Sequence, residues 1–87
     1  MAYDVVLTSR AKRELDRMPR EVFLRIDPVL RALQVNPRPY GVQKLEEDLH
    51  RIRIGDWRIL FLIHDQARRV IVIRITRRSE KTYKHLS

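Results

Sequence analysis

The apolar positions in the first part of the chain follow the period of a strand and then of two helices. Residues 3–7 (Tyr-Asp-Val-Val-Leu) suit an opening strand, and Thr8 or Ser9 can cap the helix that follows. The apolar positions of that helix keep a helical spacing at Ala11, Leu15 and Met18, and Pro19 ends it. A second apolar stripe then runs to a stop at Asn36-Pro37, and its members are Val22, Phe23, Ile26, Val29, Leu30 and Leu33. We expect this second helix to bury the apolar face of a sheet.

Pro28 conflicts with the second helix, because a proline inside a helix removes a hydrogen bond and costs about 3 kcal/mol. Asp27-Pro28 also resembles a cap followed by a first helical position, so the segment is either kinked or split there. We expect one long helix with a bend at this point.

Three further strands follow a turn-rich loop at residues 36–41, which holds two of the four prolines. The strands are expected at residues 49–54, 57–64 and 69–76, and the first two form a hairpin. Residues 59–63 are apolar without interruption, which is typical of a central strand covered on both sides. Ser79 can cap a short helix at the C-terminal end.

The element order β-α-α-β-β-β with a short C-terminal helix predicts an α+β fold. We expect a single small domain over residues 1–87, with a mainly antiparallel twisted sheet and the two N-terminal helices packed on one of its faces. A chain of 87 residues has room for one core and one functional site. The other face of the sheet then carries the arginines.

The composition narrows the range of partners. Lys and Arg number 19 against 11 Asp and Glu, a formal charge of +8, which favours nucleic acid or an acidic protein as partner. Cysteine is absent, so disulfides and thiolate chemistry are excluded. There is no signal-peptide pattern, and no apolar run approaches the roughly 18 residues of a membrane span. We expect a cytoplasmic protein with no membrane partner.

The segment LHRIRIGDWRILFLI at residues 49–63 sets two arginines against each other. Gly55 at the first loop position suits a two-residue type II′ turn, in which residue numbers that sum to 111 face each other. Arg53 then lies opposite Arg58. Like charges opposite each other destabilise a sheet by a few tenths to about 1 kcal/mol, so we expect an anion to compensate. The alternative is that both guanidinium groups extend into water while their stems cover apolar surface.

A third group of arginines closes the next strand at Arg74, Arg77 and Arg78. A concave, basic sheet face with Trp57, Tyr83 and the three histidines nearby is suited to hold a nucleic-acid backbone while an aromatic ring stacks on a base. Trp57 and Tyr83 serve equally well as packing residues. His50, His64 and His85 have no metal-ligand spacing, so we expect no metal site.

Four segments occur in an order and spacing that resemble the RelE/ParE superfamily of bacterial type II toxins over nearly the whole chain. They are YDVVLTSRAKREL, ALQVNPRPYGVQKL, HRIRIGDWRILFLI and RRSEKTY. RelE-like members are endoribonucleases that cut messenger RNA in the ribosomal A site, whereas ParE-like members poison DNA gyrase. The RelE-like reaction needs no metal or cofactor, because the 2′-hydroxyl of the substrate attacks the adjacent phosphate and leaves a 2′,3′-cyclic phosphate. The resemblance therefore implies an mRNA endoribonuclease, with a gyrase inhibitor or a catalytically inactive antitoxin-binding module as the alternatives.

The resemblance also implies roles for individual residues. Catalytic roles fall to Arg53, Arg58, Arg78 and Tyr83, and RNA contacts to Lys44, Arg51, Arg77 and Lys81. Arg51 and Arg53 match a basic pair before the hairpin, Arg58 matches the arginine after the turn, and either Arg77 or Arg78 matches the arginine that closes the last strand. Arginines can neutralise a reacting phosphate bidentately, and Tyr83 can stack on the base or align the nucleophile.

The general base is the point at which this chain departs from the pattern. Where RelE-like sites use lysine, Arg51 and Arg53 stand here, and a guanidinium stays protonated at neutral pH. The other candidates are His50, Glu46, Glu47, Lys81 and Lys84.

The partners that the resemblance implies are a cognate antitoxin protein, the ribosome and its messenger RNA. A flexible antitoxin segment would cover the basic groove or displace the terminal helix. Operator DNA is expected as a partner only through the toxin–antitoxin complex.

Overall fold

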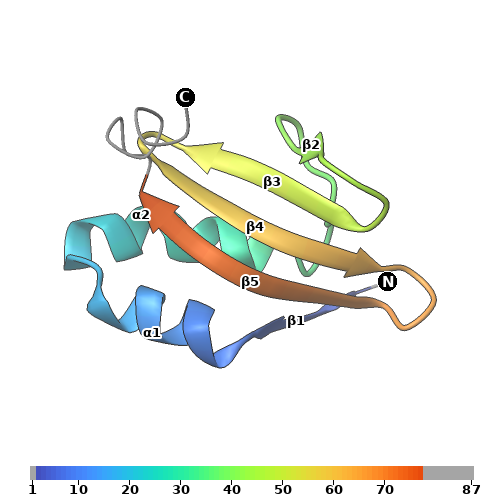
Figure 1. Ribbon diagram of the computed structural model, residues 1–87, viewed down its shortest axis with the longest axis horizontal. Coiled ribbons are helices and arrows are strands. Elements are labelled where there is room, and N and C mark those ends of the chain that lie inside the picture. Colours follow the sequence, from blue (N-terminus) through green and yellow to red (C-terminus); the bar gives the residue numbers. More distant parts are fainter. Residues whose placement is uncertain (1, 78–87) are drawn as a thin grey trace.

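The computed structural model describes residues 2–77, and this part of the chain folds into two helices and one mixed sheet (Figure 1). The elements are β1 (Asp4–Leu7), α1 (Ser9–Arg17), α2 (Arg20–Ala32), β2 (Gln43–Lys44), β3 (Leu49–Ile54), β4 (Trp57–His64) and β5 (Arg69–Arg77). The predicted α+β fold is confirmed, and the expected order lacks only the two-residue strand β2. The predicted C-terminal helix and its Ser79 cap lie outside the described residues.

The sheet has the strand order β1-β5-β4-β3-β2. β1 pairs with β5 in parallel, and every other neighbouring pair is antiparallel. The parallel pair arises because the two helices carry the chain from one end of the sheet back to the other before β3 begins. Figure 1 shows α2 behind the sheet and α1 continuing the line of β1 beside β5.

α1 begins and ends where the sequence predicts, whereas α2 ends at Ala32, a turn before the predicted stop at Asn36-Pro37. The Thr8 side chain accepts a hydrogen bond of 3.1 Å from the Ala11 N–H, which caps α1 as expected. Pro19 follows the C-cap of α1 and itself precedes the first turn of α2. α2 continues through Pro28 to Ala32, which confirms one long helix rather than two; its bend stays a prediction.

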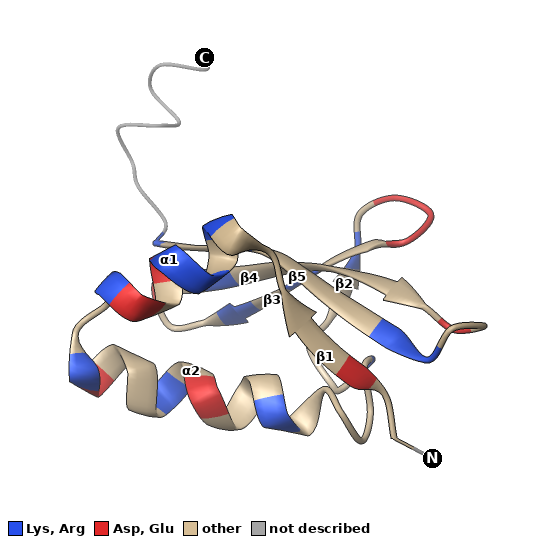
Figure 2. Cartoon of the chain, turned by 90° about the horizontal axis from the view of Figure 1, so that it is seen from below, with Lys and Arg blue, Asp and Glu red and all other residues tan. Residues whose placement is uncertain are grey.

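The core lies between α2 and one face of the sheet. Its fully buried members from the strands are Ile59, Phe61, Val70, Val72 and Ile75, and those from the helical region are Ala11, Ile26 and Leu33. In β4 every second residue is buried, while Leu60 and Leu62 are half-buried on the opposite face. β4 is a central strand, as expected, but within residues 2–77 no helix covers its second face, because α2 packs on the other face and α1 lies along the edge of β5 (Figure 2). Long neighbouring side chains shield the second face instead.

An irregularity in β5 decides which of its residues face the core. The register between β4 and β5 shifts at Leu60/Phe61, so that Leu60 pairs with Arg74 and Phe61 with Val72, and Ile73 is the extra residue. A bulge of this kind inverts the alternation of side chains beyond it. Arg74 consequently faces away from the helices, and Arg77 faces toward them.

α1 covers the edge of β5 beyond the end of β1. The carboxylate of Glu14 accepts a hydrogen bond of 2.8 Å from the Ile75 N–H and one of 3.0 Å from Arg74 Nε. The Thr8 N–H donates to the Val72 carbonyl at 3.0 Å. These contacts satisfy backbone groups that would otherwise form an open sheet edge. Within residues 2–77, neither helix is long and apolar enough to cross a membrane.

Candidate functional site

The hairpin between β3 and β4 forms in the register that the sequence predicts. Arg53 pairs with Arg58, and Ile54 pairs with Trp57 to close the turn. Gly55, the first loop residue, has a φ of +60°. Among the described non-glycine residues only Arg68 has a positive φ, so the second loop residue, Asp56, does not. A single positive φ at the first loop position matches a type II′ turn and excludes type I′.

Four arginines lie on the sheet face that neither described helix covers, which we call the open face. They are Arg51 and Arg53 from β3, Arg58 from β4 and Arg74 from β5. Leu60 lies at the centre of this group, because it pairs with Arg51 on one side and with Arg74 on the other. Neighbouring strands are about 4.8 Å apart, so the four side chains surround one small area of surface.

Arg51 and Arg74 are held in place by other side chains. Arg51 donates from Nη2 to the side-chain oxygen of Gln43, which lies opposite it in β2. Arg51 Nε is buried and has no hydrogen-bond partner among the described residues. Arg74 forms its ion pair with Glu14. Ordering these long side chains before a ligand arrives lowers the entropic cost of binding.

Sequence reasoning missed Gln43 and gave Arg74 no role. The signal for Gln43 was absent, because a two-residue edge strand has no periodicity of its own. Arg74 was noted only as one of three clustered arginines, and its face depends on the bulge at Ile73.

The structure separates two predicted RNA contacts from the open face. Arg77 pairs with Trp57 and lies on the helix side of the sheet. Lys44 pairs with His50, a core-facing residue, so it also lies on the helix side and is exposed at the sheet edge. Arg78, Lys81 and Tyr83, like Lys84 and His85, lie outside the described residues.

The expectation that Trp57 and the histidines border the basic face is wrong for Trp57 and His50. Trp57 alternates onto the helix side, as its pairing with Ile54 requires. His50 is 4% exposed, stacks on Phe61 at 5.8 Å between ring centroids, and has Nδ1 2.8 Å from the Asp48 carbonyl oxygen. His64 is six residues from Arg58 along β4, which is roughly 20 Å at about 3.4 Å per residue.

The candidate bases within residues 2–77 are not beside the Arg53–Arg58 pair. His50 is buried in the core. Glu46 and Glu47 belong to the loop that joins β2 to β3, at the opposite end of β3 from the turn. Figure 2 shows this acidic loop far from the hairpin end of the sheet. The described residues also contain no cluster of three or more His, Asp or Glu side chains that could hold a metal ion.

A second cluster of charged groups, the Asp65 clasp, lies in the turn after β4. Arg38 donates to both carboxylate oxygens of Asp65, at 3.1 and 2.9 Å, and the Tyr3 hydroxyl donates to Asp65 Oδ1 at 2.7 Å. The hydrogen bonds from Arg38 and then from Tyr3 lower the pKa of Asp65 from 3.8 to about 2. The same contact with Asp65 raises the pKa of Tyr3. The clasp joins the N-terminus, the loop at residues 36–41 and the turn between β4 and β5.

Known proteins share both the sequence pattern and the fold of this chain. Residues 5–82 match the family model described as the ParE toxin of the type II toxin-antitoxin system parDE. Over 80 residues the chain is 36% identical to Toxin RelE of Mycobacterium tuberculosis, covering 88% of this chain and 82% of that protein.

Solved structures of low sequence identity show the same fold. The archaeal RelE–RelB complex from Pyrococcus horikoshii OT3 contains a chain with a TM-score of 0.84 and 24% identity, covering 92% of this chain and 99% of that one. The isolated E. coli RelE toxin gives a TM-score of 0.79 at 21% identity, covering 98% of this chain and 96% of that one.

Proposed function

Because this chain belongs to the RelE/ParE family of type II toxin-antitoxin toxins, we propose that it is a ribosome-dependent endoribonuclease that cleaves messenger RNA. The observation that carries the proposal is the group of four arginines around Leu60 on the open face. Such a group offers several bidentate sites for phosphate on a surface that single-stranded RNA can reach.

The register of the hairpin brings Arg53 and Arg58 unusually close. The Ile63 N–H donates to the Asp48 carbonyl, so these two residues form a hydrogen-bonded pair. Hydrogen-bonded and non-hydrogen-bonded pairs alternate along an antiparallel hairpin, so every second pair from there to the turn is also hydrogen-bonded. Arg53 and Arg58 therefore form a non-hydrogen-bonded pair, for which the Cα atoms are about 4.5 Å apart. A phosphate group bound between the two guanidinium groups receives donors from both sides.

The reaction that this geometry supports is transesterification within the RNA. The 2′-hydroxyl oxygen bonds to the adjacent phosphorus, the bond from phosphorus to the 5′-oxygen breaks, and the leaving oxygen takes a proton. The products are a 2′,3′-cyclic phosphate and a 5′-hydroxyl. Arg53 and Arg58 stabilise the charge on the non-bridging oxygens in the transition state, and Arg51 and Arg74 hold neighbouring phosphates.

The remaining roles belong to residues outside the described part of the chain. Arg78 adds charge at the phosphate and Tyr83 stacks on the base or aligns the nucleophile. Lys81 and Lys84 remain as candidates for the group that takes the proton of the 2′-hydroxyl, with Lys81 otherwise a contact to the RNA backbone. Lys44 lies at the edge of the sheet and Arg77 at the end of β5. Each therefore contacts RNA only where the RNA strand extends past the open face.

The test is induction of the chain in a bacterium, followed by mapping of messenger RNA 5′ ends on translating ribosomes. We expect cuts within A-site codons, and a loss of at least a hundredfold in cutting for Arg58→Ala, since removing one preorganised donor costs about 10²–10³ in rate. Arg69→Ala is the matched control, because Arg69 is an exposed β5 arginine at the other end of the sheet. Cuts that persist in Arg58→Ala would contradict the proposal.

A second candidate function is inhibition of DNA gyrase, which the absence of a lysine at positions 51 and 53 favours. Growth arrest with intact messages, together with inhibition of supercoiling by the purified protein, would support that function instead. No arrest at all would leave a catalytically inactive module that binds an antitoxin.

The proposed partners follow from the same face. RelE toxins from P. horikoshii and E. coli are bound to RelB antitoxins in their crystal structures. We extend this to a cognate antitoxin for the present chain, with an acidic or apolar segment over the open face. Operator DNA is bound through that complex, and the ribosome supplies the messenger RNA.

A further inference from the structure

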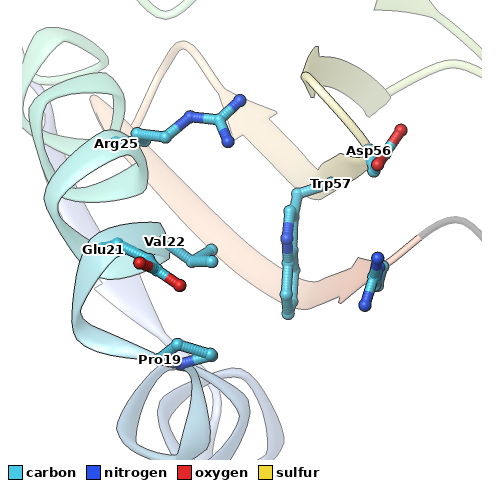
Figure 3. Close-up of a pocket in the computed structure, with 7 residues that line it drawn as sticks. Pro19, Glu21, Val22, Arg25, Asp56 and Trp57 are labelled. Carbon is cyan, nitrogen blue, oxygen red and sulfur yellow. The ribbon is translucent and has the colours of Figure 1, made fainter.

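A cavity of about 680 Å³ lies between α2 and the hairpin turn, on the helix side of the sheet. Pro19 and Val22 form its apolar wall, and Trp57 forms the wall opposite. Figure 3 shows the Trp57 indole across the gap from Val22 and Glu21. A hollow of about 320 Å³ continues past Pro19 and Trp57 toward α1. This volume is that of a small-ligand site, and none of the catalytic roles above uses it.

We propose that this cavity binds the base of an RNA nucleotide adjacent to the one that is cleaved, stacked on Trp57. The inference rests on the proposed function, since it requires RNA at the open face. Indole rings stack on bases of any sequence. The cavity is also lined by Glu21 and Asp56, whose carboxylates accept hydrogen bonds from exocyclic amino groups. Cytosine, adenine and guanine carry such a group and uracil does not, so the cavity favours the first three.

The cavity and the arginine pair share one turn. Asp56 and Trp57 line the cavity and also line a small hollow, of about 30 Å³, together with Arg53 and Arg58. An RNA strand whose phosphate lies between Arg53 and Arg58 therefore needs only to pass over this turn for its next base to enter the cavity.

Two further arginines suit the phosphate of that nucleotide. Arg77 lines the cavity at the end of β5, and Arg25 reaches into it from α2 (Figure 3). The Arg25 guanidinium lies so close to the turn that a Cβ atom at Gly55 would be 2.3 Å from Arg25 Nη2. The missing side chain at Gly55 thus lets Arg25 lie against the turn that carries the Arg53–Arg58 pair.

The experiment uses the fluorescence of Trp57, which is the one tryptophan in the chain. The probe is a short single-stranded oligoribonucleotide in which every 2′-hydroxyl is methylated, so that it binds and is not cleaved. We expect saturable quenching of the emission, and weaker binding by about tenfold for Arg25→Ala. Arg31→Ala is the matched control, because Arg31 is an exposed arginine on the same helix that pairs with Asp27.

Base preference is measured with probes that differ at one position. Cytosine is expected to bind several-fold more tightly than uracil there, and Glu21→Ala with Asp56→Ala to remove the difference, because alanine leaves no side-chain oxygen to accept from the amino group. The inference would be overturned if RNA bound in an Arg58-dependent way and left the Trp57 emission unchanged. It would also be overturned if a segment of a protein partner occupied the cavity without weakening the binding of RNA. Normal cutting of messenger RNA by Arg25→Ala would contradict this inference and leave the proposed function intact. Absence of cutting by the unmodified chain would contradict the proposed function itself.

Discussion

Arg53 and Arg58 face each other across a turn of two residues, and their repulsion acts against the hairpin. The repulsion amounts to a few tenths to about 1 kcal/mol. The hairpin forms nevertheless, because Ile52 and Ile59 meet on the other face and are buried in the core. A phosphate between the arginines replaces repulsion with two attractive contacts. At the scale of single residues, the proposed affinity for a polyanion would thus be gained at some cost to the stability of the free chain.

Gly55 is the residue at which this turn is most sensitive. Its φ of +60° costs a residue with a side chain about 1–2 kcal/mol, and a Cβ atom also meets Arg25. We expect Gly55→Ala to lower the free energy of unfolding by at least this amount, and Arg25→Ala in the same chain to restore part of it. Urea denaturation of the two single variants and the double variant measures the coupling. Strict additivity of the two effects would show that the contact with Arg25 carries no strain.

At the scale of elements, α1 acts as a cover for the edge of β5. β1 is four residues long and leaves the second half of β5 without a strand neighbour on that side. Glu14 takes the place of a strand there, since it accepts from the Ile75 N–H and fixes Arg74 on the open face. One side chain of a helix therefore both closes the sheet and orders part of the candidate site.

Removal of the Glu14 carboxylate is expected to destabilise the chain by about 1–3 kcal/mol, because the Ile75 N–H loses its acceptor in a half-buried place. Glu14→Ala shows the full effect. Glu14→Gln retains an oxygen that accepts this hydrogen bond, so its effect is smaller. Thermal or urea unfolding measures both, with Asp16→Ala on the same helix as control. Equal stability of Glu14→Ala and the unmodified chain would refute this role.

At the scale of the whole molecule, the charge is distributed unevenly. The formal charge is +8, yet the loop between β2 and β3, at the end of β3 away from the hairpin turn, is acidic (Figure 2). We propose that the arginines of the open face attract a polyanion.

Binding of single-stranded RNA is therefore expected to weaken steeply with salt. Each phosphate contact contributes a slope of about −0.7 in a plot of log K against log salt, so four contacts give about −3. Arg53→Gln is expected to reduce the slope by about one contact, and Arg69→Ala to leave it unchanged. Fluorescence anisotropy of a labelled oligoribonucleotide across a salt series measures the slope. A slope that is the same in both variants would exclude Arg53 from the phosphate contacts.

The Asp65 clasp predicts a loss of stability in acid. The pKa of Asp65 is lowered in the folded chain to about 2, so the stabilisation is complete above the ordinary value of 3.8 and disappears as the pH falls toward 2. The clasp is exposed, so the effect is small and weakened by salt. We expect the melting temperatures of the unmodified chain and Asp65→Asn to differ at pH 5 and to converge by pH 2. Asp16→Asn serves as control, and a constant difference across this range would contradict the assignment.

Much of the fold and part of the site follow from the sequence alone, because their determinants are local. Periodic apolar residues, the Thr8 cap and the prolines define both helices. A two-residue turn at Gly55 forces the register of β3 and β4, which places Arg53 against Arg58. The same rule was sufficient to place Trp57 on the helix side, although its aromatic character suggested the basic face.

The tertiary structure alone decided the face of each arginine in β5 and the existence of the cavity. Residues 70–73 are all apolar, so both faces of this part of β5 look alike in the sequence and nothing signals the bulge at Ile73. That bulge turns Arg74 to the open face and Arg77 to the helix side. The bulge lies where β5 pairs with β4 and where Glu14, sixty residues from Arg74 in sequence, accepts hydrogen bonds from Arg74 and Ile75. Likewise Arg25 and Trp57 meet around one cavity because α2 crosses the sheet at that place. Local sequence determines elements and turns, whereas contacts between distant segments are selected by the packing of the whole core.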